Sequence, residues 1–171
     1  MNLLQSIRIL EQTAVLQPGV NSIVRNDVFR LNETPEAKYG VFAWLQGQHS
    51  TSADGSLVTY NFTLFYVDRL NADHSNEIQI QSVGMETLEN IIRRVEEMGL
   101  FATDYTFQTF NQRFADDCAG VFCNVSFEAA KDGLCPAAYS FIEDGGSFNI
   151  SFDYSYRVGA YRTRGKTVII F

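Results

Sequence analysis

The chain has 171 residues, a net charge of −7 and a high aromatic content, with 14 Phe and 8 Tyr. This length suits a single domain with a sizeable core, and the aromatic residues favour a sheet over a helix bundle. No stretch approaches the ~18 consecutive apolar residues that span a bilayer, and the N-terminus lacks the basic start and apolar block of a signal peptide, so we expect no membrane contact and synthesis in the cytoplasm.

The N-terminal segment has the pattern of a helix. Its apolar residues from Leu3 to Ala14 fall on one broad helical face, and Pro18-Gly19 ends the pattern. We therefore expect a helix over about residues 2–16. The width of its apolar face leaves two interpretations open: the helix packs on the sheet alone, or one flank also packs on a neighbouring subunit.

Three strands are expected next, in residues 21–31, 39–48 and 57–70. The third alternates over its whole length, which is typical of a strand, and we expect it at the centre of the sheet. Asp54-Gly55 provides the turn that precedes it. The three strands are expected to form an antiparallel meander, with an irregularity in the first strand at Asn26-Asp27.

Helical periodicity replaces the alternation after residue 70. Apolar residues recur at spacings of three, four and seven, which predicts a long amphipathic helix over about residues 75–98. Ser75 is the expected N-cap, and Gly99 is expected to close the helix in the left-handed conformation. One apolar stripe is expected to face the sheet: Ile78, Met85, Leu88, Ile91, Ile92 and Val95.

The last part of the chain predicts more strands. Residues 105–110 and 120–129 alternate and are expected to join the same sheet, and residues 148–156 form an amphipathic strand with an aromatic face. Residues 167–171 form a bare apolar strand at a free terminus, where unpaired residues would fray. Two interpretations are open for it: pairing within the same subunit, or addition to the sheet of a neighbour.

These elements predict an α+β fold. Residues 1–130 are expected to form a mainly antiparallel sheet packed against the N-terminal helix and the long central helix. Residues 131–171 are expected to form a β-rich C-terminal extension, either within the same domain or appended to it. This extension carries a charge asymmetry: residues 155–171 hold four basic residues and no acidic one, so residues 1–154 carry −11. A basic tail on an acidic body predicts an electrostatic contact.

No pattern typical of an enzyme site is present. His49 and His74 each lie in a polar loop without the partners of a catalytic triad, and there is no phosphate-binding loop. A turn can bring Asp68, Asp73 and Glu77 together to bind a cation, but their spacing is not that of a calcium-binding loop. We therefore expect no catalytic residue, no cofactor and no metal site.

The three cysteines also lack a functional spacing. Cys118, Cys123 and Cys135 match no paired zinc pattern, and their odd number leaves one thiol over in any disulfide scheme. We expect them to be plain buried or half-buried thiols.

The block that joins the long strand to the long helix resembles a known family. Thr59-Tyr60-Asn61-Phe62, then Val67-Asp68-Arg69-Leu70, Asp73 and Ser75-Asn76-Glu77 before a long helix, is similar to the core block of bacteriophage neck proteins. These are tail-terminator, tail-completion and head-to-tail connector subunits, including ring proteins of crAss-like podoviruses. The resemblance implies a structural virion protein that forms a ring of 6 or 12 subunits, contacts neighbouring portal, ring or tail proteins, and meets DNA only passively as it passes through the channel.

Two groups of residues are the candidate contacts under this resemblance, one in the turn and one in the basic tail. They are Asp68, Arg69, Asp73, Ser75, Asn76 and Glu77, and Arg157, Arg162, Arg164, Lys166, Ile169 and Phe171. Two other function classes stay open. One is a small soluble binding module, for example for carbohydrate, that uses Trp44 or the Tyr154 and Tyr156 face as a platform. The other is an enzyme whose site is assembled from scattered loops.

Overall fold

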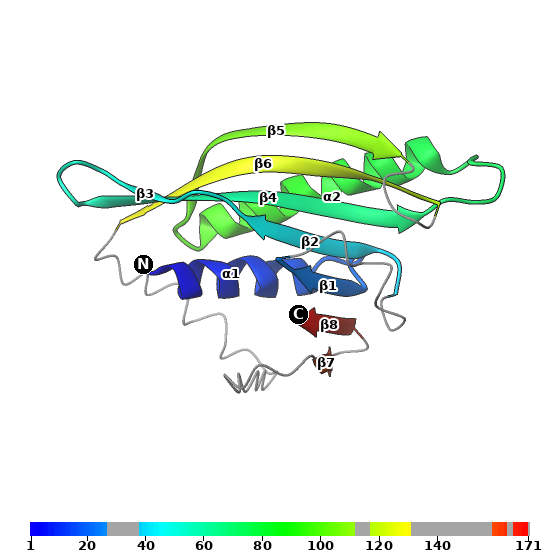
Figure 1. Cartoon of the computed structure of the whole chain (residues 1–171), viewed down its shortest axis with the longest axis horizontal. Helices are drawn as coiled ribbons and strands as arrows, with labels where there is room; N and C mark the ends of the chain where they lie inside the picture. The colour runs from blue at the N-terminus through cyan, green and yellow to red at the C-terminus, as the bar shows by residue number, and fades with distance from the viewer. Residues whose placement is uncertain (27–37, 112–116, 131–158, 164–165, 171) are drawn as a thin grey trace.

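The computed structural model describes residues 1–26, 38–111, 117–130, 159–163 and 166–170, the last two ranges by their backbone alone. They form an eight-stranded sheet and two helices, which confirms the α+β class (Figure 1). In chain order the elements are α1 (Leu3–Val15), β1 (Ser22–Arg25), β2 (Val41–Gln46), β3 (Ser50–Thr51), β4 (Leu57–Arg69), α2 (Glu77–Glu97), β5 (Phe101–Asn111), β6 (Cys118–Ala130), β7 (Gly159–Thr163) and β8 (Lys166–Ile170). The strand order is β5-β6-β4-β2-β1-β8-β7, and β3 pairs with β4 beside this path.

Strand β4 organises the sheet, as its long alternating pattern predicted. It pairs antiparallel with β6 along its whole length, from Leu57 opposite Ala130 to Arg69 opposite Cys118. On its other side it pairs antiparallel with β2 and β3. Alternate residues of β4 are buried under the helices, among them Tyr60, Phe62, Leu64 and Tyr66.

The predicted meander is wrong at its first strand. β1 runs parallel to β2, with Ser22 opposite Val41, whereas β2 and β4 are antiparallel. A parallel neighbour needs a long connection that returns the chain to the same end of the sheet, and residues 26–40 supply that length. The irregularity is found at Asn26, whose φ of 58° ends β1; residues 27–31 of the predicted strand lie outside the described residues.

Helix α1 begins with a capping box. The Asn2 side chain accepts a hydrogen bond from the Gln5 backbone N–H at 2.9 Å, and the Gln5 side chain accepts one from Asn2 at 2.9 Å. The helix buries Ile9, Leu10 and Ala14 against the same face of the sheet as α2. The predicted boundaries are therefore confirmed to within one residue.

Helix α2 is confirmed as an element, but its predicted apolar stripe is partly wrong. Leu88 and Ile92 are buried, whereas Ile78 is 81% exposed and Met85 41% exposed. The reason is Gly84, where α2 approaches the sheet so closely that an added Cβ would lie 2.9 Å from Tyr66 Cδ1. Because the helix meets the sheet at this glycine, the residue that follows it is turned away from the core.

Gly99, with a φ of 88°, closes α2 as predicted, and its N–H donates to the Glu96 carbonyl at 2.9 Å. Strand β5 then starts at Phe101, four residues earlier than predicted, with a register irregularity between Ala102 and Asp104. β6 follows its predicted pattern, with its buried residues facing the helices: Val121, Cys123, Val125 and Phe127.

Two interpretations were open for the C-terminal strand, and the structure shows that it pairs within its own chain. β8 lies parallel to β1, with Val168 opposite Ile23, and antiparallel to β7. The predicted aromatic strand at residues 148–156 and the terminal Phe171 lie outside the described residues. A smaller cluster of buried apolar residues lies on the second face of the sheet, opposite the helices: Val24, Val41, Ala43, Phe65, Val67, Phe110 and Cys118.

Candidate assembly surfaces

The segment from Asp68 to Glu77, called the junction below, contains the end of β4, the connecting loop of residues 70–76 and the first residue of α2. The Asn76 side chain holds its two ends together: its Oδ1 accepts from the Asn71 backbone N–H at 2.8 Å, and its Nδ2 donates to the Arg69 carbonyl at 3.1 Å. Asn76 occupies the N-cap position of α2 but makes no side-chain cap hydrogen bond. The amide group of Asn76 makes its hydrogen bonds to other residues of the junction. It therefore stabilises the shape of the loop and does not cap the helix.

The prediction that Ser75 caps α2 is wrong. Its hydroxyl accepts from Asn71 Nδ2 at 3.2 Å, and its backbone N–H donates to Asp73 Oδ1 at 3.1 Å. His74 adopts a left-handed φ of 55°, which turns the chain before the helix begins at Glu77. The hydrogen bonds from Ser75 lower the pKa of Asp73 below its ordinary value, because they favour the carboxylate.

The remaining junction residues each have a separate partner. Asp68 accepts from the Arg69 backbone N–H at 2.7 Å, and the Arg69 guanidinium lies 5.7 Å from the centre of the Tyr39 ring. Glu77 accepts from Asn111 Nδ2 at 3.0 Å, which ties the start of α2 to the end of β5. The structure thus brings all six predicted turn residues together in the junction. Arg69, Asp73 and Ser75 are exposed there, and Asp68, Asn76 and Glu77 are half-buried. In the described parts of the chain no acidic, histidine or cysteine side chains cluster to hold a metal ion.

Ile78 is a surface residue that the sequence analysis placed in the core. It sits in the first turn of α2, directly after the junction, and is the most exposed large apolar side chain among those described. The helix rotation set at Gly84 turns Ile78 outward. Only the contact between the helix and the sheet reveals this, because the sequence spacing of Ile78 fits the apolar stripe.

Strand β5 lies at the rim of the sheet (Figure 1). Its eleven residues contain a single charged side chain, Asp104, and two exposed aromatic ones, Phe101 at 62% and Tyr105 at 40%. Within residues 1–26, 38–111, 117–130, 159–163 and 166–170, no strand pairs with its outer edge. The Ala102 N–H at one end donates to Glu96 Oε1 at 3.2 Å, whereas the backbone of residues 103–109 has no partner beyond β6 in the described parts of the chain and can pair with another chain.

A shallow polar pocket lies on the second face, over β4, β6 and β5. Its floor is closed by pairs between the strands: Ser126 Oγ donates to Asn61 Oδ1 at 2.6 Å, and Thr63 Oγ1 donates to Asn124 Oδ1 at 2.8 Å. The groups bond to one another and so offer little to a ligand. Trp44, one of the two predicted sugar platforms, is buried among the helices; Tyr154 and Tyr156, the other, lie outside the described residues.

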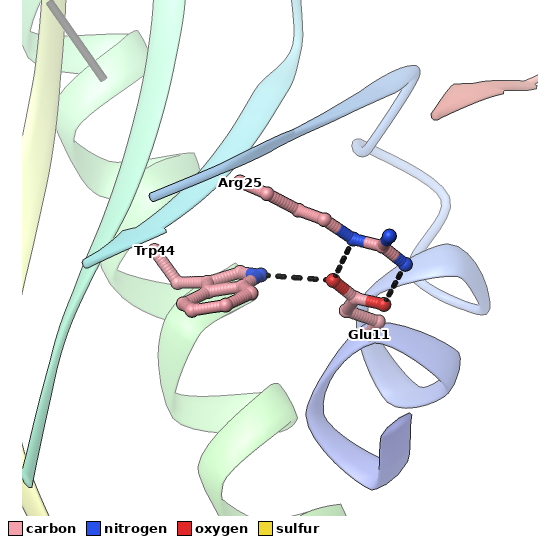
Figure 2. Close-up of polar contacts among 3 residues, drawn as sticks. All are labelled: Glu11, Arg25 and Trp44. Carbon is pink, nitrogen blue, oxygen red and sulfur yellow. Dashed lines mark hydrogen bonds and ion pairs between the residues drawn. The ribbon is translucent and has the colours of Figure 1, made fainter. Parts of the chain in front are cut away.

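A buried ion pair joins α1 to the sheet, as Figure 2 shows. The Glu11 carboxylate accepts two hydrogen bonds from the Arg25 guanidinium and a third from Trp44 Nε1 at 3.1 Å. These three residues come from α1, β1 and β2. The sequence analysis missed this cluster, although an acidic residue within the apolar face of α1 was a visible signal. Its satisfied donors and acceptors indicate a structural clamp.

His49 is likewise held in a structural contact. Its Nδ1 accepts from the Asn61 backbone N–H at 3.3 Å, its Nε2 lies 2.7 Å from Gln46, and its ring contacts those of Tyr60 and Phe62. Burial lowers the pKa of His49 below its ordinary value. The histidine therefore secures the hairpin before β4 and has no nucleophile in its described contacts.

The predicted tail contacts are separated from the junction. Arg162 lies in β7, and Lys166 and Ile169 lie in β8, at the opposite rim of the sheet from β5. Ile169 pairs with Val24 of β1 through the backbone. Arg157, Arg164 and Phe171 lie outside the described residues.

No known family model matches this chain, and no curated protein matches it significantly.

A search of the described helices found none with the length and apolar content required to cross a bilayer.

Proposed function

We propose that this chain is a structural subunit of an oligomeric ring in a phage head-to-tail connector or tail terminator, and that it acts by assembly and not by catalysis. The proposal rests on the resemblance of residues 59–77 to phage neck proteins. The observation that carries it is the junction itself, in which side-chain hydrogen bonds hold a loop in one shape next to the exposed Ile78.

A pre-shaped loop beside an exposed apolar residue is suited to a protein contact. Because the junction is already ordered by Asn76, it loses little conformational entropy on binding. Covering an isoleucine side chain that is otherwise in water contributes about 1.5–3 kcal/mol. Its sequence neighbours Glu77 and Gln79 are polar, as residues at the rim of many protein interfaces are.

A closed ring needs two different surfaces on each subunit, so that every subunit contacts the next in the same way. The junction is one candidate and carries three carboxylates, from Asp68, Asp73 and Glu77. The β7–β8 hairpin lies at the far rim of the sheet and belongs to the basic tail. Contact between the junction of one subunit and the hairpin of the next would bring opposite charges together.

The test is the mass of the purified protein, measured by light scattering and native mass spectrometry, with particle images for symmetry. We expect a ring of 6 or 12 subunits. Ile78→Glu is expected to reduce the assembly to smaller species without changing the melting temperature, because Ile78 contributes little to the core. Gln79→Glu is the matched control, since it adds the same charge at the neighbouring exposed position. A wild-type protein that stays monomeric at high concentration would contradict the proposal.

A further inference from the structure

Strand β5 is an unusual sheet edge because it lacks the usual protection. Exposed edges are commonly short, or carry lysine, proline or an irregularity that prevents other chains from pairing with them. β5 has eleven residues, and Phe101–Asn111 contains no Lys, Arg or Pro. Its irregularity lies near one end, between Ala102 and Asp104, and leaves a regular stretch after it. Such an edge, rich in Thr and aromatic residues, favours pairing with a further strand.

We propose that β5 pairs antiparallel with β5 of a second copy of this chain, around a two-fold axis at Thr106. The inference goes beyond the ring contact at the junction and does not depend on it. In this register Asp104 lies opposite Gln108, Tyr105 lies opposite Phe107, and the two Thr106 residues face each other. The strand is thus complementary to itself, as a two-fold interface requires.

The faces of the strand agree with this register. Asp104 and Thr106 pair with Ser126 and Asn124 and lie on the second face of the sheet, as Gln108 does. Tyr105 and Phe107 alternate with them and lie on the helix face. Opposed residues of an antiparallel pair point to the same face, so each proposed pair joins residues of one face.

Charge disfavours a two-fold axis at Asp104, and aromatic packing favours one at Thr106. An axis at Asp104 would place the two carboxylates opposite each other, which is destabilising. The axis at Thr106 gives each carboxylate an amide partner. Tyr105 and Phe107 already contact edge to face, with ring centroids 5.6 Å apart, and the axis would join both pairs in one four-ring cluster that covers the exposed Tyr105.

The short strand β7 is a poorer partner for this edge. It has five residues, so it would leave more than half of β5 unpaired. A second β5 can pair over residues 103–109 in this register, about 24 Å at a rise of ~3.4 Å per residue. A two-fold contact uses the same surface on both subunits, so it would not join successive subunits around the proposed ring and would instead pair subunits that belong to two different rings.

A disulfide at the axis tests the proposal in the full-length chain. Thr106→Cys is made together with Cys135→Ser, since Cys118 and Cys123 are buried thiols. In the proposed register the two Thr106 residues are directly opposite, about 4.5–5.5 Å apart between Cα atoms, within reach of a disulfide. Mild oxidation is expected to convert most of the protein to a covalent dimer on non-reducing gels.

Thr109→Cys in the same background is the matched control. It is the same substitution in the same strand, but the proposed register places the two Thr109 residues about 20 Å apart at ~3.4 Å per residue, so no dimer is expected. A mixture of Asp104→Cys and Gln108→Cys proteins is expected to form a mixed disulfide that neither forms alone.

The outcomes separate this proposal from the ring. A Thr106→Cys dimer without a ring supports the β5 contact alone. A ring whose Thr106→Cys thiols stay reduced overturns the β5 contact. A monomer in which that thiol resists maleimide also overturns it, because the edge is then covered by its own chain. Equal cross-linking of Thr106→Cys and Thr109→Cys would overturn the register.

Discussion

Glu11 is the residue whose surroundings most clearly require a fixed partner. Its carboxylate is buried between α1 and the sheet, where an unpaired charge is costly, and it accepts three hydrogen bonds from Arg25 and Trp44. The orientation of α1 is therefore tied to β1 and β2 by one side chain. This explains why an acidic residue stands in a helix face that otherwise carries no charge.

The protonation of a single residue, His49, is expected to make the stability of the fold depend on pH. Burial lowers its pKa in the folded state, so the unfolded chain, with a pKa near 6.5, takes up the proton first. The contribution of the neutral histidine is present above pH 6.5 and is lost as the pH falls through 6.5 toward the folded-state pKa. We expect the free energy of unfolding, measured by urea titration, to decrease from pH 7.5 to pH 5.5.

The variant His49→Gln is expected to flatten this decrease, because it removes the titrating ring while its contacts with Gln46, Tyr60, Asn61 and Phe62 involve no charged side chain. His74→Gln serves as the control and is expected to retain the pH dependence of the wild type. An unchanged dependence in the His49 variant would assign the effect to other groups.

The orientation of α2 is decided at the scale of the element. It packs tightly on β4 and β6 at Gly84, where a Cβ would lie 2.9 Å from Tyr66 Cδ1 and 3.2 Å from Val121 Cγ2. This contact turns Leu88 and Ile92 inward and Ile78 outward. A glycine that weakens the helix locally is therefore the residue that allows it to pack closely.

Gly84→Ala tests this packing. Alanine raises the helix propensity by about 1 kcal/mol, but overpacking against the buried Tyr66 costs about 1–3 kcal/mol. We expect a net loss of up to about 2 kcal/mol in the free energy of unfolding, measured by urea denaturation. Ser82→Ala, at an exposed position of the same helix, is the control and should be neutral or slightly stabilising. A Gly84 variant more stable than wild type would contradict the close contact.

At the scale of the whole molecule, the C-terminal hairpin extends the same sheet that begins with β5. Its β8 pairs with β1, so deleting residues 157–171 would remove a strand of the sheet as well as the basic charge. Substitution of the basic residues tests the effect of the charge alone, because it leaves the strand in place. β5 and β7 are the two rims of the sheet, and under the two proposals each would serve a different contact in assembly.

Replacing the four basic tail residues Arg157, Arg162, Arg164 and Lys166 by Gln is expected to weaken the ring while leaving the melting temperature close to that of the wild type. Backbone pairing of β7 and β8 does not require these charges. Sedimentation velocity is expected to show that salt weakens wild-type assembly and has less effect on the variant, because exposed charges are screened beyond about 8–10 Å. Equal assembly of both proteins at low salt would contradict an electrostatic role for the tail.

The sequence by itself determined the local elements. α1, α2, β4 and β6 each carry an apolar period that is complete within one segment, and Gly99 ends α2 as its position predicts. These patterns were sufficient for the α+β class, because the period of a helix or strand depends on neighbouring residues alone.

The tertiary structure decided everything that depends on residues far apart in the chain. The parallel pairing of β1, the rotation of α2 at Gly84 and the burial of Glu11 all depend on such contacts. The same holds for β8, whose sequence was compatible with a partner in its own chain or in a neighbour. The apolar sequence of a strand indicates that it is buried, but it does not identify the strand with which it pairs. That partner is determined by the sheet edge that the rest of the fold leaves free.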